Sequence, residues 1–307
     1  MATEGAQAPP APDRRALTAF AGAVLIGGTN FVGVRLSNRE LDPLWGAALR
    51  FAIAAAVFAV ICLSLRLRLP RGRTLALVVA YGLLGFGAAY GLLYVAMLEV
   101  SAGVAAVVMA MGPLLTLMLA VAHRLEKFSA RAAAGAVIAV GGSVLAFLRP
   151  GQPVDWMSLL LLGGAALCAA ESMVVSKLCG RQHPAVMNLI GMSVATLALL
   201  LISRLAGEHW ALPEEGTTQI ALAYLVAGTV GLFVLVLVVV QRWTASATAY
   251  LFVLMPIVAA LVGALVADEP ITTNLAVGAV VVFLGVYVGA LSRTQRRQLP
   301  PATTPPS

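Results

Sequence analysis

The chain has few charged residues. Asp, Glu, Lys and Arg together make up 11% of its 307 residues, whereas hydrophobic residues make up 61%. A typical soluble domain carries about 25% charged residues, so this chain has too little polar surface to cover a fold surrounded by water. The scarcity of charge therefore excludes a soluble globule and predicts that much of the protein lies in lipid.

Cysteine and histidine are scarce as well. The three cysteines are odd in number and lie in or beside apolar stretches, which argues against a disulfide framework. The three histidines show no spacing typical of metal ligands, and the sequence has no nucleotide-binding loop. We therefore expect no cofactor, no metal site and no enzymatic activity.

Long apolar stretches are what the sequence has in abundance. An apolar helix of roughly 20 residues crosses a bilayer core of about 30 Å, and ten stretches reach about that length. The sequence thus predicts an all-α polytopic membrane protein with ten transmembrane helices. The expected spans are residues 16–34, 44–65, 74–98, 101–122, 130–148, 156–178, 184–205, 217–240, 244–266 and 271–292.

The ends of the chain and its basic residues predict the orientation. Residues 1–15 and 293–307, rich in alanine, proline and small polar residues, are expected to be disordered tails. With both ends in the cytoplasm, most of the 20 basic residues fall on the cytoplasmic side, including the run at 66–73. This bias obeys the positive-inside rule and accounts for the net charge of +7 without a nucleic-acid partner. The outer basic residues are then Arg35, Arg39, Arg149 and Arg204.

The sequence contains an internal repeat. The stretch LMPIVAALVGALVADEPIT at 254–272 matches MGPLLTLMLAVAHRLEKFS at 111–129. The match places Pro256 on Pro113 and Glu269 on Glu126, and it continues to Gly278 on Gly135. The halves are residues 16–148 and 156–292, joined by a linker at 149–155. Each half has five spans, an odd number, so the second half must be inverted, an arrangement typical of alternating access.

The repeated residues have expected local roles. A proline within a span removes a backbone hydrogen bond, so Pro113 and Pro256 are either gating kinks that face a cavity or packing kinks. The two repeated glutamates are expected to bond loops rather than solute. Ser101 and Thr244 are expected to cap helices, and the short turns before them predict that spans three and four, and spans eight and nine, are antiparallel neighbours.

Several stretches resemble the EamA repeat of the drug/metabolite transporter superfamily. They are GGTNFVGVRL at 27–36, DPLWGAALRF at 42–51, and the two segments that begin at Pro113 and Pro256. The resemblance covers nearly the whole chain between the tails; Gly27 departs from it, because the family usually carries tryptophan there. It implies a bacterial inner-membrane protein with ten helices, a central cavity lined by spans one, three, four, six, eight and nine, and export of small metabolites, often amino acids.

Two ionisable residues lie within predicted spans, Arg50 in span two and Glu171 in span six. A charge inside the bilayer is expensive, so such residues are functional candidates. Arg50 is expected to bind either a substrate carboxylate or backbone carbonyls. Glu171 is expected to bind a substrate amine, to carry a coupling proton, or to be structural. A direct salt bridge between the two needs helix tilt.

Polar and aromatic residues complete the predicted substrate site. Tyr90 and Tyr94 share one face of span three, where they either stack on a solute or fill space beside the GxxxG pattern of Gly87 and Gly91. The sequence predicts a secondary transporter that exports amino acids or related amphipathic metabolites. Drug efflux, a membrane sensor and a lipid-modifying enzyme are the alternatives, and proton coupling and a homodimer through Gly285 and Gly289 stay open. The other expected substrate-binding residues are Asn30, Ser172, Thr248 and Tyr250.

Overall fold

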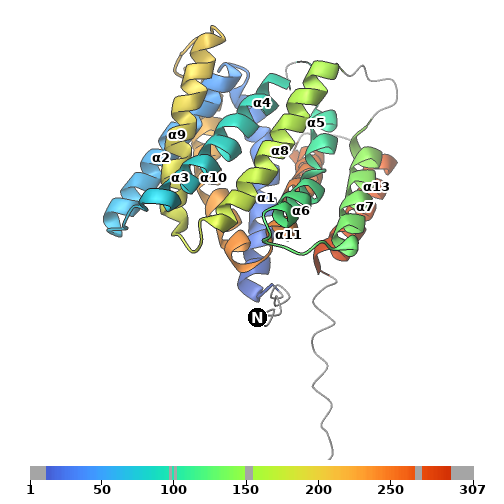
Figure 1. The fold of residues 1–307 in the computed structure, drawn as a ribbon. Coiled ribbons are helices and arrows are strands. Elements are labelled where there is room, and N and C mark those ends of the chain that lie inside the picture. Colours follow the sequence, from blue (N-terminus) through green and yellow to red (C-terminus); the bar gives the residue numbers. More distant parts are fainter. Residues whose placement is uncertain (1–11, 97–98, 100–101, 149–154, 267–271, 292–307) are drawn as a thin grey trace, which may run out of the picture.

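The structure is a computed structural model that describes residues 12–96, 99, 102–148, 155–266 and 272–291. Most of both predicted tails, most of the predicted linker, Ser101 and Glu269 lie outside these residues. The described chain forms a bundle of helices (Figure 1). Its elements are α1 (Arg14–Ser37), α2 (Pro43–Ser64), α3 (Gly72–Gly82), the π-helix η1 (Leu83–Ala88), α4 (Ala89–Ala96), α5 (Ala102–Met109), α6 (Gly112–Ala122), α7 (Ala130–Phe147), α8 (Trp156–Leu178), α9 (Pro184–Leu205), α10 (Gly216–Arg242), α11 (Ala245–Thr248), α12 (Leu251–Val266), α13 (Thr273–Val286) and the π-helix η2 (Tyr287–Leu291).

These helices lie at the ten predicted spans. Nine helical stretches of the described residues are long and apolar enough to cross a membrane, and α1, with 24 residues, lies at the position of the first predicted span. Span three is α3, η1 and α4 in sequence, span four is α5 and α6, and span nine is α11 and α12. The protein is therefore a multi-pass membrane protein, as the sequence predicts.

Polar side chains and prolines define where the helices begin. The Ser129 hydroxyl accepts a hydrogen bond from the Ala132 N–H (3.2 Å), and the Thr272 hydroxyl accepts one from the Leu275 N–H (3.2 Å). Thr244 caps α11 in the same way, as predicted. Pro43 and Pro184 begin α2 and α9, where a missing N–H costs no helical bond.

The two repeated prolines occupy different settings. The helix of span four is interrupted between α5 and α6, and Pro113 lies in the first turn of α6. In span nine the interruption lies between Thr248 and Leu251, and Pro256 is inside α12. The repeat predicts equivalent kinks, but the two breaks fall at positions that do not correspond.

Packing between helices follows the inverted repeat. Span two packs on span seven (α2 on α9), and span five packs on span ten (α7 on α13), each helix meeting its own repeat equivalent. Span one packs on eight and nine (α1 on α10 and α12), and the equivalent span six packs on three and four (α8 on α4 and α6). In Figure 1, α7 and α13 lie at one end of the bundle and α2 and α9 at the other. Each contact between two spans thus has a counterpart between the equivalent spans of the other half, in agreement with inverted five-helix repeats.

The predicted neighbours within each half are not the main helix contacts. Span three packs mainly on α8 and α9 rather than on α5 and α6, and α10 packs mainly on α1, with a smaller contact to α11 of span nine. The short turns join helices in sequence, but the larger contact surfaces form between the halves. Turn length therefore did not determine which helices pack together.

Small residues bring α7 and α13 together. A Cβ atom at Gly135 would lie 2.4 Å from the Gly289 Cα, and one at Gly142 would lie 2.6 Å from the Val282 N. From the α13 side, a Cβ at Gly285 would lie 2.6 Å from the Ala139 N. The glycines of span ten thus pack inside the chain, and Gly87 and Gly91 have ordinary contact distances of 3.7 Å to α9 side chains.

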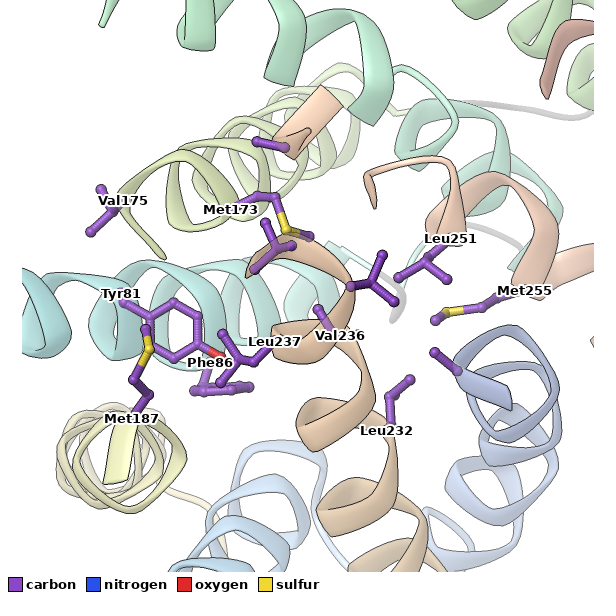
Figure 2. Close-up of a cluster of buried hydrophobic side chains, with 14 of the residues drawn as sticks. Tyr81, Phe86, Met173, Val175, Met187, Leu232, Val236, Leu237, Leu251 and Met255 are labelled. Atoms are coloured by element: carbon purple, nitrogen blue, oxygen red, sulfur yellow. The ribbon is translucent and has the colours of Figure 1, made fainter. Parts of the chain in front are cut away.

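The apolar core surrounds α10. Leu232, Val236 and Leu237 of this helix project into a cluster of buried side chains from several spans (Figure 2). Met255 reaches from α12 toward α1, where a Cβ at Gly27 would lie 2.4 Å from its Cε. The space beside Gly27 is therefore filled by Met255.

Candidate functional site

Arg50 is buried between α2 and α10. Its side chain is 3% exposed, and its Nε donates a hydrogen bond to the Thr229 hydroxyl at 2.6 Å. Within the described part of the chain, no carboxylate lies within ion-pairing distance of this guanidinium. A buried charge is costly unless it is paired. Arg50 is therefore a cation with one neutral hydrogen-bond partner among the described residues.

Aromatic rings surround this guanidinium. Its central carbon lies 5.4 Å from the centre of the Phe51 ring and 5.8 Å from that of Tyr90, within the range of cation–π attraction. Tyr90 meets Phe51 edge to face at 5.1 Å and lies 6.2 Å from Tyr94. Phe86 continues the cluster toward Phe233 of α10, with ring centres 4.5 Å apart. The structure thus brings together three predicted residues, Arg50, Tyr90 and Tyr94.

Asn30 of α1 is the second buried polar group beside α10. It is 5% exposed, and neither its Oδ1 nor its Nδ2 has a hydrogen-bond partner. A Cβ atom at Gly228 would lie 2.4 Å from Oδ1, so the amide is pressed against the backbone of α10. Buried side-chain amides are normally bonded, which makes Asn30 an exception in the described structure.

Glu171 pairs with a residue that sequence reasoning missed. Its Oε1 lies 2.8 Å from the Nε2 of His123, which follows α6 directly. Its Oε2 is buried and has no hydrogen-bond partner in the part of the chain that the structure describes. A direct salt bridge between Arg50 and Glu171, which from the sequence needs helix tilt, is not formed: Glu171 pairs with His123 and Arg50 bonds to Thr229. His123 falls on Val266 in the repeat, so the departure from the repeat that identified Glu171 would also have identified His123.

Three other predicted residues are bonded to the backbone. The Ser172 hydroxyl donates to the Tyr81 carbonyl at 2.9 Å, where span three changes to η1. Thr248 donates to the Thr244 carbonyl at 2.7 Å, and Tyr250 donates to the Ala132 carbonyl at 3.3 Å. These bonds account for the three hydroxyls within the fold, and their role as substrate ligands stays a prediction.

Two apolar grooves flank α10. One, of about 660 Å³, lies between α2 and α10 and is lined by side chains such as Ile53, Val57 and Val226. The other, of about 410 Å³, lies between α1 and α10 and includes Thr29 and Tyr224. Neither groove is lined by Arg50 or Asn30. Both polar side chains are therefore closed off from these grooves in this conformation.

Carboxylates tie the two halves together on the outer side. Glu208 accepts hydrogen bonds from the Leu44 N–H (3.0 Å) and the Trp45 N–H (2.7 Å) at the start of α2. Trp45 stacks on Trp210 with ring centres 5.3 Å apart. Glu40 accepts in return from the Glu214 N–H (2.5 Å) just before α10. We call residues 40–45 together with 203–215 the outer clasp.

A smaller network lies on the inner side. Glu126 accepts hydrogen bonds from the N–H and the hydroxyl of Ser246 at the start of α11, which supports the expected structural role of this glutamate. Lys177, at the end of α8, donates to the Trp243 carbonyl. Arg242 pairs with Asp13 at 2.8 Å, which places the beginning of α1 on the same side as the end of α10.

Comparison with known proteins gives consistent results. A sequence profile described as "EamA-like transporter family" matches residues 14–148 and again residues 156–290. A "Probable amino-acid metabolite efflux pump" of Escherichia coli K12 is 28% identical over 289 residues, which are 89% of this chain and 94% of that protein. An "Uncharacterized inner membrane transporter YedA" of the same strain is 30% identical over 88% of each chain. A solved crystal structure with 18% identity has the same fold, with a TM-score of 0.76 over 92% of this chain and 100% of its own.

Proposed function

This chain belongs to the EamA-like transporter family, and from that membership we propose that it exports amino acids or closely related amphipathic metabolites across the bacterial inner membrane. The observation that carries the proposal is Arg50, a buried cation that has a hydroxyl but no carboxylate beside it in the described structure. A solute carboxylate would supply the missing charge. Relatives named as amino-acid metabolite efflux pumps support the same class of solute.

The mechanism that fits the fold is alternating access. The two halves meet through matching pairs of helices that repeat the same contacts on the two sides of the bundle. Such a pair of inverted halves has two related conformations, one open to each side of the membrane. Arg50 and its aromatic neighbours contact helices of both halves, α2 from the first and α10 from the second. A solute bound there would be accessible first from one side of the membrane and then from the other as the halves rearrange.

The experiment is counterflow in liposomes that contain the purified protein. Labelled amino acids are compared with a set of amines, sugars and nucleobases, and saturable uptake restricted to amino acids or similar carboxylates is the expected result. A signal for sugars or nucleobases alone, or silence across the whole set with folded protein, would overturn the proposal.

Replacement of Arg50 provides the specific variant. Arg50→Gln removes the charge, and because hydrogen bonds to charged groups contribute about 1.5–3 kcal/mol, we expect at least a tenfold loss of apparent affinity for the transported amino acid. Arg39→Gln, which removes an exposed arginine of the outer loop, is the matched control and should transport normally. Equal behaviour of the two variants would show that Arg50 does not bind the solute.

Drug efflux is a second candidate, and the aromatic cluster favours it. Phe51, Tyr90 and Tyr94 offer ring faces and edges that suit aromatic solutes as well as apolar amino-acid side chains. Protection of growing cells by the expressed protein, measured against toxic amino-acid analogues and against aromatic drugs, separates the two candidates. Metabolite export predicts protection against the analogues alone.

We further propose that Glu171 carries a coupling proton. The carboxylate has one oxygen paired with His123, and its second oxygen is buried and unbonded. A proton on Glu171 would weaken its pairing with His123, which follows α6, and so would loosen the contact between α6 and α8. Energy for export would then come from protons that bind at this pair.

A further inference from the structure

One turn of α10 contacts both buried polar side chains, Arg50 and Asn30. Thr229 accepts the hydrogen bond from Arg50, and the preceding residue, Gly228, lies against the Asn30 amide. Adjacent Cα atoms are 3.8 Å apart. Asn30 of α1 and Arg50 of α2 therefore contact two consecutive residues of α10.

The amide of Asn30 has no structural use in the described fold. Both polar atoms are buried and unbonded, and an unmade bond at a buried polar group destabilises a protein. A side chain that stabilised the fold would have a partner here. An amide offers one acceptor and two donors, and since both of its ends are unbonded, it can present either end to a ligand by a rotation.

The glycine at 228 makes room for this amide. Any larger residue would place a Cβ atom 2.4 Å from the Asn30 Oδ1. One turn further along α10, Gly231 has its nearest neighbour, the Ile26 Cδ1, at 3.4 Å from the corresponding position. Gly228 is thus the position on α10 where the close approach is to a polar atom of α1, and Gly231 is a matched position where the approach is to an apolar atom.

We propose that Asn30 and Arg50 form a two-part site for the head group of an amino acid. Arg50 binds the carboxylate, and the Asn30 Oδ1 accepts a hydrogen bond from the ammonium group. Thr229 and Gly228 act as positioning residues, one for each part. Because both side chains are buried here, solute reaches them in a conformation in which α1 moves away from α10. The inference rests on the proposed function and adds that the amine is recognised separately from the carboxylate.

The experiment uses matched sets of three compounds in counterflow competition. L-phenylalanine is compared with 3-phenylpropanoate, which lacks the amine, and with phenethylamine, which lacks the carboxylate; the corresponding leucine set is run in parallel. Wild-type protein should prefer each amino acid over both analogues by about tenfold to a hundredfold, the range expected for one hydrogen bond to a charged group.

The variants should separate the two parts of the site. Asn30→Ala should abolish the preference over the acid that lacks the amine and should keep the preference over the amine. Arg50→Gln should do the reverse. Gly228→Ala should reproduce Asn30→Ala, and Gly231→Ala should leave both preferences as in wild type. In the double variant, Gly228→Ala should have no effect beyond that of Asn30→Ala, because the Asn30 Oδ1 that Gly228→Ala would displace is already absent.

Stability distinguishes a binding role from a structural one. Because the Asn30 amide has no partner among the described residues, Asn30→Ala should leave the melting temperature unchanged or raise it, and a fall of several degrees would overturn the proposal. If wild type carries the amino acids but Asn30→Ala still prefers each amino acid over the acid that lacks the amine, the inference is wrong and the proposed function stands. If wild type carries neither amino acid, the head-group site is overturned, and the wider counterflow set decides the proposed function.

Discussion

Single carboxylates join the halves at their outer ends. Glu40, in the loop before α2, accepts hydrogen bonds from backbone N–H groups just before α10. The Glu214 N–H, with the Thr218 hydroxyl and the Glu215 N–H, lowers the pKa of Glu40 below its ordinary value of 4.5. The charged form of Glu40 is therefore the one that forms this side chain's part of the outer clasp.

This bond predicts a pH-dependent stability. A group whose pKa is lower in the folded state stabilises the fold above its unfolded pKa, near 4.5 for Glu40, and this stabilisation is lost as the pH falls through the folded pKa. We expect Glu40→Gln to melt below wild type at pH 7, and the difference should shrink as the pH falls below 4.5. The measurement is the melting temperature in detergent at several pH values; a difference that grows toward acid would contradict the expectation.

The sequence identified the two charged residues of the candidate site, Arg50 and Glu171, but not the residues that they contact. Arg50 and Glu171 stand out because ionisable residues are rare within spans and because both depart from the repeat. Thr229 lies 179 positions from Arg50 and is a common residue type, so nothing in the local sequence marks it. Gly228 is likewise one of 29 glycines, and its role depends on the distance between α1 and α10.

At the scale of helices, the contact between α7 and α13 depends on small residues. Gly142 faces the α13 backbone, whereas the adjacent Gly141 has no neighbouring atom within 4 Å of the position where a Cβ would lie. The adjacent Gly141 and Gly142 thus have different structural roles. The repeated glycines were predictable from the sequence as a pattern, but their partner helix was not, because the same pattern suits packing within a chain or between two chains.

We expect Gly142→Ala to destabilise the protein and Gly141→Ala to be neutral or slightly stabilising. Overpacking typically costs about 1–3 kcal/mol, and the neighbour of Gly142 is backbone that has little room to move. Alanine has a higher helix propensity than glycine, and a Cβ atom at Gly141 would have no neighbouring atom within 4 Å. Thermal unfolding of the two variants side by side in detergent is the test, and equal melting temperatures would show that the α7–α13 contact is looser than described.

At the scale of the whole molecule, the two halves are similar in fold but differ in charge. Glu171 and His123 pair at the contact between α8 and α6. The equivalent contact of the inverted repeat is between α1 and α12, and there Thr29 stands at the position that corresponds to Glu171. If Glu171 carries a coupling proton as proposed, that proton would act at the first contact alone, because a neutral side chain stands at the equivalent place in the second.

This asymmetry predicts how transport responds to a pH gradient. In liposomes, wild-type transport should change several-fold when a gradient is imposed, and Glu171→Gln should remove that response. His123→Asn should weaken it, whereas His209→Asn, at a side chain that is 95% exposed in the outer loop, should leave it intact. If Glu171→Gln transports with undiminished sensitivity to the gradient, Glu171 does not carry the coupling proton.

The fold as a whole was predictable because its main signals are local. The length of each span can be read from a short stretch of sequence. The bias of basic residues and the odd number of spans in each half can be counted. Helix contacts depend on shape, and the expected pairing of spans three with four was wrong for that reason. The break in span four lies just before Pro113, near the kink that the sequence predicts, whereas the break in span nine lies between Thr248 and Leu251, ahead of Pro256. The position of the proline therefore predicted the first break but not the second.

The outer clasp also has a consequence for biosynthesis. The Leu44 and Trp45 N–H groups at the start of α2 are bonded by Glu208, which is 164 and 163 positions further along the chain. While the ribosome is still making the intervening spans, the Leu44 and Trp45 N–H groups of α2 lack their Glu208 partner. That helix is completed only after α9 has crossed and carried Glu208 to the outer side, so the first half finishes folding after much of the second has been inserted.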